Sequence, residues 1–138
     1  MKNRKFWSIL LILLPLIAAA LYVLPDSVRM KWASPDEPLY TYISGYDMLA
    51  VGYALYDPIL TGVSSVIASV LGIVCAVKPN EKSRKQMRGF VLFAMACCVC
   101  TAIRGAMTWV GAVIFFLLIV EFVLLMGIRK YETTENEE

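Results

Sequence analysis

Residues 78–130, KPNEKSRKQMRGFVLFAMACCVCTAIRGAMTWVGAVIFFLLIVEFVLLMGIRK, decide how the chain is threaded. An apolar stretch of 39 residues, 90–128, lies between two basic clusters. Basic residues that flank membrane helices stay on the cytoplasmic side, so both ends of this stretch belong there. A single helix would place its two ends on opposite sides. The sequence therefore predicts a helical hairpin, with helices at about 90–104 and 109–128 and a bend at Arg104 and Gly105.

The composition of the chain is that of a membrane protein. Hydrophobic residues make up 59% of the 138 residues and charged residues only 17%. Two further apolar runs, at about 6–24 and 59–77, approach the roughly 20 helical residues that a hydrocarbon core of about 30 Å requires. We therefore predict an all-α membrane protein, with four transmembrane helices in a bundle that forms a single domain over residues 1–130.

The charges of the connecting segments predict the orientation of these helices. The N-terminus carries three basic residues and no acidic one before residue 6, and the connector 78–88 has five basic residues against one acidic residue. The connector 25–58 has two basic and five acidic residues. By the positive-inside rule, we expect an outer loop at 25–58, an inner loop at 78–88 and cytoplasmic termini in a multi-pass protein of the cell membrane. The acidic tail 131–138 is expected to be disordered.

Two of these assignments have alternatives. The first apolar run follows basic residues and contains Ala18, Ala19 and Ala20, which fits a cleaved signal peptide as well as a retained helix. Its length and its continuation through Tyr22 favour a retained helix. The basic connector 78–88 either sets topology only or also contacts anionic lipid headgroups.

The outer loop contains the pattern of a small β-hairpin. Val28, Met30 and Trp32 alternate with basic residues, and this period of two is typical of a half-buried strand. A second strand is expected at 39–43, after a turn at 33–38 that contains two prolines. We therefore expect a small hairpin or interfacial element in this loop.

Aromatic residues are concentrated in the same loop. The candidate binding surface consists of Trp32, Tyr40, Tyr42, Tyr46, Tyr53 and Tyr56. Tyrosine and tryptophan prefer the headgroup layer, because each has an apolar ring and a polar group. These residues either anchor the loop to the membrane or form an exposed surface for a peptide, a lipid headgroup or a membrane-protein partner.

Glu121 is the acidic residue that the sequence places within an apolar helix. It lies about 10 Å from the cytoplasmic end of that helix, at a rise of 1.5 Å per residue. Ser69 and Cys97 lie at similar depths on their own helices, so a polar cluster of Glu121, Ser69 and Cys97 is a candidate intramembrane site. Such a carboxyl group either belongs to a transport path or makes one interhelical hydrogen bond that orients the packing.

The sequence offers no chemistry for an enzyme. It contains no histidine, the commonest general base and metal ligand. Cys97 and Cys100 share a helix face with no second cysteine pair, which favours packing over a metal or redox site. We therefore predict no catalytic residue, no cofactor and no metal, and we expect no nucleic-acid partner.

One part of the chain resembles a known family. Leu24-Pro25-Asp26, Val28, Lys31-Trp32 and Asp36-Glu37-Pro38, followed by Tyr40 or Tyr42, are the residues that carry the similarity. Over about residues 6–45 the chain resembles sporulation-delay immunity-type bacterial membrane proteins, although Lys31 stands where histidine is usual and Pro35-Asp36 where asparagine or glycine is expected. The resemblance implies a polytopic protein of the bacterial plasma membrane that is tied to toxin immunity or envelope signalling.

These observations leave two function classes. The first is a non-enzymatic binding, immunity or accessory protein that acts through its outer loop. The alternative is a transporter or channel subunit that forms a homo-oligomer and uses Glu121.

Overall fold

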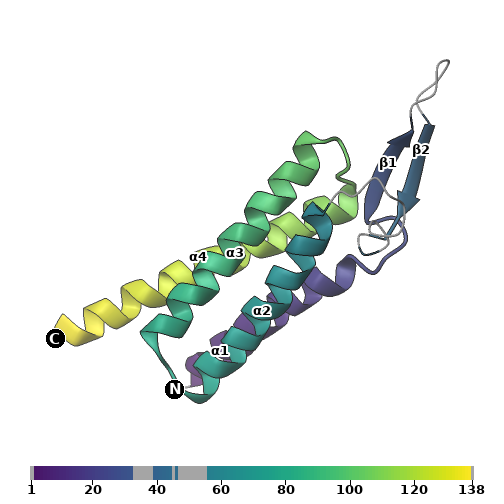
Figure 1. Cartoon of the computed structure of the whole chain (residues 1–138). Coiled ribbons are helices and arrows are strands. Elements are labelled where there is room, and N and C mark those ends of the chain that lie inside the picture. Colours follow the sequence, from purple (N-terminus) through teal and green to yellow (C-terminus); the bar gives the residue numbers. More distant parts are fainter. Residues whose placement is uncertain (1, 33–38, 45, 47–55, 138) are drawn as a thin grey trace.

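The computed structural model describes residues 2–32, 39–44, 46 and 56–137, and it is mostly helical. Figure 1 shows long helices side by side with a small two-stranded sheet at one end. The elements are α1 (Lys2–Leu21), β1 (Val28–Trp32), β2 (Leu39–Ile43), α2 (Asp57–Val77), α3 (Glu81–Ile103) and α4 (Trp109–Glu137).

The four helices run alternately up and down. α1 packs against α2 and α4, and α3 packs against the same two helices. The sheet lies at the end where α1 and α3 finish, which we call the hairpin end (Figure 1). Both chain termini and the short connection between α2 and α3 lie at the other end, which we call the terminal end.

Three helices in the described part of the chain are long and apolar enough to cross a membrane, namely α2, α3 and residues 109–127 of α4. The apolar part of α1 is shorter and spans Lys5–Leu21. The sequence predicted this helix at 6–24, but α1 ends at Leu21. Pro25 accounts for the early end, because it has no N–H to donate to the carbonyl of Leu21 four residues earlier and it disfavours helical geometry at Leu24.

Two helix boundaries differ from the prediction. α3 begins at Glu81 and not at 90, so only residues 78–80 of the expected inner loop separate it from α2. The side chain of Asn80 accepts a hydrogen bond from the backbone N–H of Lys82 at 3.0 Å, which caps the first turn. α4 continues to Glu137 through the segment predicted to be disordered. Neither glycine nor proline follows Gly127, so no strong stop signal ends the helix.

The predicted strands are confirmed. β1 and β2 are antiparallel, and Val28 pairs with Ile43 and Trp32 with Leu39. The predicted bend between α3 and α4 is also present, and Gly105 occupies the left-handed region there with φ +72°. Glycine adopts this conformation without the steric cost that a Cβ would bring.

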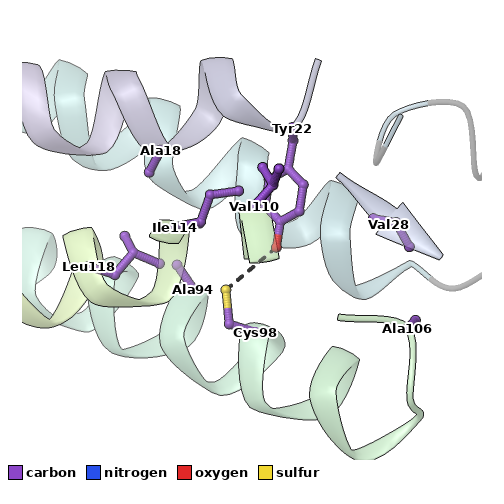
Figure 2. Close-up of a cluster of buried hydrophobic side chains, with 9 residues drawn as sticks. All are labelled: Ala18, Tyr22, Val28, Ala94, Cys98, Ala106, Val110, Ile114 and Leu118. Carbon is purple, nitrogen blue, oxygen red and sulfur yellow. Dashed lines mark hydrogen bonds between the residues drawn. The ribbon is translucent and has the colours of Figure 1, made fainter. Parts of the chain in front are cut away.

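Two clusters of buried side chains form the core. The first lies towards the hairpin end, and Figure 2 shows Tyr22 pointing into it from the end of α1. Its members are Ala18, Tyr22, Val28, Ala94, Cys98, Ala106, Val110, Ile114 and Leu118. The second cluster comprises Leu11, Ala68, Met87, Val91 and Leu125. Because Val28 belongs to the first cluster, the hairpin shares the hydrophobic core of the helices.

α1 and α2 approach each other closely at Gly72. A Cβ at this position would lie 3.2 Å from Cγ1 of Ile12 and 3.4 Å from the carbonyl oxygen of Leu11. Pro15 lacks the N–H that would otherwise bond that carbonyl within α1. The hydroxyl of Ser69 donates to the carbonyl oxygen of Ile12 at 2.8 Å, which ties α2 to the turn that precedes the proline.

Candidate functional site

The hairpin is attached to the connection between α3 and α4. The backbone N–H of Arg29 donates to the carbonyl oxygen of Ala106 at 3.0 Å, and Val28 and Met107 form an antiparallel bridge. Nε of Arg29 donates to the carbonyl oxygen of Gly105 at 2.7 Å. The connection therefore pairs with β1 on the side away from β2.

Hydroxyl groups tie the segment before β1 to the helices. The hydroxyl of Thr108 lies 2.9 Å from the carbonyl oxygen of Asp26 and 2.8 Å from that of Ser27, and it donates to this pair. Ser27 and Ser44 both donate to the carbonyl oxygen of Tyr22, at 3.1 and 2.8 Å. Carbonyl groups at the end of a helix have no intrahelical donor, and these hydroxyls supply one.

Tyr46 joins the segment after β2 to α1 and α2. Its hydroxyl donates to the carbonyl oxygen of Ala19 at 2.6 Å, and its ring lies edge-on to that of Tyr22 with centroids 6.4 Å apart. A Cβ at Gly62 would lie only 2.5 Å from the Tyr46 hydroxyl oxygen, so the glycine makes room for the ring. Burial raises the pKa of Tyr46 above its ordinary value of 10.0.

The predicted tyrosine surface is divided by these contacts. Tyr42 and Tyr56 are exposed, whereas Tyr46 is half-buried and serves as an attachment point. Tyr40 pairs with Lys31 across the hairpin, so Trp32 and Tyr40 both lie on its strands. Tyr53, with the expected interfacial segment 47–55, lies outside the described residues.

An ion pair lies beside the hairpin, at the same end of the helices. Nε of Arg104, after α3, lies 3.4 Å from Oδ2 of Asp57, the first residue of α2. This oxygen is buried and accepts no hydrogen bond from the described residues, so the contact is electrostatic. The sequence placed Arg104 at the bend between the third and fourth helices. Its side chain is 57% exposed, so the same guanidinium can also meet anions at the surface.

The structure places the residues of the predicted intramembrane cluster on three helices. Glu121 is fully buried on α4, and its two carboxyl oxygens have no hydrogen-bond partner among the described residues. Ser69 donates to Ile12 of α1. Cys97 is buried on α3, and its backbone carbonyl accepts a hydrogen bond from Thr101. No hydrogen bond joins these three side chains in the described part of the chain.

Glu121 lies between the two core clusters. Leu118 and Leu125, three residues before and four after it, belong to the first and the second cluster. Residues at this spacing share one helix face, so the carboxyl group is on the face that α4 turns towards the core. Burial of an unpaired carboxyl group is costly, and this makes Glu121 a candidate functional residue.

A polar chain at the hairpin end was missed by the sequence analysis. The hydroxyl of Tyr22 is hydrogen-bonded to Sγ of Cys98 at 3.6 Å (Figure 2). That thiol donates to the hydroxyl of Thr61 at 3.9 Å. Thr61 donates in turn to the carbonyl oxygen of Asp57 at 2.8 Å. Tyr22, Thr61 and Cys98 lie far apart in the chain, and the only sequence signal was a tyrosine within the first apolar run.

Neither a metal site nor a related protein is found for this chain among the described residues and the known proteins compared. No group of three or more histidine, cysteine, aspartate or glutamate side chains in the described ranges could hold a metal ion. Compared with known protein families, with curated proteins and with solved structures, the chain has no match. The class that the geometry defines is a helical protein with three helices able to cross a membrane and a two-stranded hairpin attached at one end.

Proposed function

We propose that this chain is a multi-pass membrane protein that binds a peptide or protein partner through its hairpin end, without catalysing a reaction. Its helices form a four-helix transmembrane bundle with cytoplasmic termini, and the hairpin faces the outer side. The common position of both termini and of the basic connection 78–80 at the terminal end supports this orientation (Figure 1).

The attachment of the hairpin is the observation that carries the proposal. Backbone, hydroxyl and guanidinium hydrogen bonds join residues 26–29 to residues 105–108. Tyr46 attaches the segment that follows β2. A surface that is already ordered loses less conformational entropy when it binds, and the exposed Tyr42 and Tyr56 supply aromatic area at low entropic cost.

An immunity or accessory role is the specific form of this function that we favour. It rests on the resemblance of residues 6–45 to sporulation-delay immunity-type bacterial membrane proteins, which also suggests the bacterial plasma membrane. β1 and β2 lie within that region, so part of the segment that carries the resemblance is held in position by the helices.

The second candidate is a transporter or channel subunit in a homo-oligomer. The observation in its favour is Glu121, whose carboxyl oxygens are buried with no hydrogen-bond partner among the described residues. Unpaired carboxyl groups within the membrane often mark ion or proton pathways.

Photo-cross-linking from the hairpin end distinguishes the two candidates. A benzophenone amino acid is placed at Tyr42 or Tyr56 in the full chain expressed in bacterial membranes, with Val70 as the control. Val70 is an exposed apolar residue of α2 that we expect to face lipid. Binding at the hairpin end predicts one discrete adduct from positions 42 and 56 and none from position 70, and the adduct persists in Glu121→Gln. Adducts of equal yield from all three positions, or none from 42 and 56, would contradict the proposal.

A further inference from the structure

The first turns of α3 bear basic side chains on an exposed helix face. Lys82, Lys85, Gln86, Gly89 and Phe93 follow one another at intervals of one, three or four residues, so they share one side of the helix. All five are exposed. The basic part of this face adjoins its apolar part directly, which is the order of groups at a membrane surface.

A shallow, open hollow lies where the basic and apolar parts meet. Its volume is about 400 Å³, and it is lined by Gln86, Gly89, Phe90 and Phe93. A Cβ at Gly89 would meet no atom of the described residues within 4 Å. The missing side chain thus leaves space beside two aromatic rings, and the hollow is wide enough for a hydrocarbon chain.

We propose that this face of α3 binds an anionic phospholipid. Lys82 and Lys85 contact the charged headgroup, and the upper part of an acyl chain lies in the hollow at Gly89. Residues 78–88 contain five basic residues against one acidic residue, and this charge complements a negatively charged headgroup. The proposal requires that α3 crosses a membrane, and it is independent of what the hairpin binds.

The charge also argues against a second copy of the chain as the occupant. Two copies that met through this face in the same orientation would bring Lys82 and Lys85 of one close to Lys82 and Lys85 of the other. Like charges at an interface are unfavourable. A zwitterionic lipid fills the same hollow but lacks the net charge that the two lysines attract.

Native mass spectrometry of the full chain tests the proposal. The chain is released from nanodiscs that contain equal amounts of phosphatidylglycerol and phosphatidylcholine with identical acyl chains, and the bound lipids are counted. The wild type is expected to retain phosphatidylglycerol selectively. Lys82→Gln with Lys85→Gln should lower this preference by about fivefold for each lysine. Gly89→Leu should also lower it although every charge remains, because leucine fills the hollow.

Matched variants separate this site from a general charge effect. Lys2→Gln with Lys5→Gln removes two charges from the start of α1 at the terminal end, and Gly127→Leu adds a leucine at another open glycine; neither should change the preference. Phe93→Ala serves as a second variant of the hollow, since an exposed side chain leaves no internal cavity. Circular dichroism confirms that each variant is folded. The proposal would be overturned if both lysine pairs lowered the preference for phosphatidylglycerol equally. It would also be overturned if neither Gly89→Leu nor Phe93→Ala changed this preference, or if Gly89→Leu changed only the formation of dimers.

Discussion

Replacement of Gly72 by leucine is expected to separate α1 from α2 and to lower the free energy of unfolding by about 3 kcal/mol. Even a Cβ at this position would lie 3.2 Å from Ile12 and 3.4 Å from the Leu11 backbone. The rest of a leucine side chain has no space unless the helices move apart. That movement also breaks the hydrogen bond from Ser69 to Ile12.

Reversible unfolding in mixed micelles of sodium dodecyl sulfate and a mild detergent measures this loss. Gly127→Leu is the control, because a side chain at Gly127 meets no atom of the described residues within 4 Å. Both variants remove a glycine from a helix, so the gain in helix propensity is common to them. Equal stability of the two variants would show that α1 and α2 do not approach closely at Gly72.

Replacement of Glu121 by leucine is expected to raise the free energy of unfolding by about 2 kcal/mol. The carboxyl group is fully buried between the core clusters, and neither oxygen has a hydrogen-bond partner in the described part of the chain. A leucine of similar size keeps the packing and removes two polar atoms. Glu121→Gln should bring no comparable gain, since a buried amide also requires hydrogen bonds.

The same unfolding assay compares the two variants of Glu121. A loss of stability in Glu121→Leu would show that the carboxyl group has a partner that stabilises the fold. A gain in stability would show that Glu121 destabilises the fold and is present for a reason other than stability. A transport assay then becomes decisive, because the transporter alternative predicts transport by the wild type that Glu121→Gln abolishes, whereas the binding function predicts no transport by either.

The sequence predicted the hairpin well because its signal is local. Alternation of Val28, Met30 and Trp32, followed by a turn with two prolines, indicated both strands, and β1 and β2 have the expected limits. The bend at Gly105 was predicted for a similar reason, since charge and glycine interrupted an apolar run. Local patterns of this kind do not depend on the rest of the fold.

The start of α3 was misplaced because hydropathy responds only to the apolar part of a helix. The turns that precede Phe90 are rich in charged and polar side chains and contain one apolar side chain, the buried Met87, so they contributed little to the apolar pattern. A capping signal was nevertheless present in Asn80, which ends the connection and caps the helix. A prediction that used Asn80 as the N-cap would have placed the start of α3 correctly.

The contacts of the candidate site depended on tertiary structure. Glu121 was singled out from its position in an apolar helix, but the absence of a hydrogen-bond partner among the described residues follows from how α4 packs against α1 and α3. Arg29 and Gly105 are 76 residues apart, and no sequence pattern announces their hydrogen bond. Tyr46 likewise showed its role only when the space at Gly62 was known.

A disulfide between positions 28 and 107 tests most directly that the hairpin is held against the helices. Val28 and Met107 form an antiparallel bridge, and the neighbouring N–H of Arg29 donates to the carbonyl oxygen of Ala106. Val28 and Met107 are therefore a pair that is not hydrogen-bonded to each other. Cα atoms in such a pair lie about 4.5 Å apart, which suits a disulfide. With the native cysteines replaced by alanine, Val28→Cys with Met107→Cys should cross-link rapidly and nearly completely in the membrane, whereas Tyr42→Cys with Met107→Cys should not. Failure of the first pair, or equal rates for both pairs, would contradict an attached hairpin.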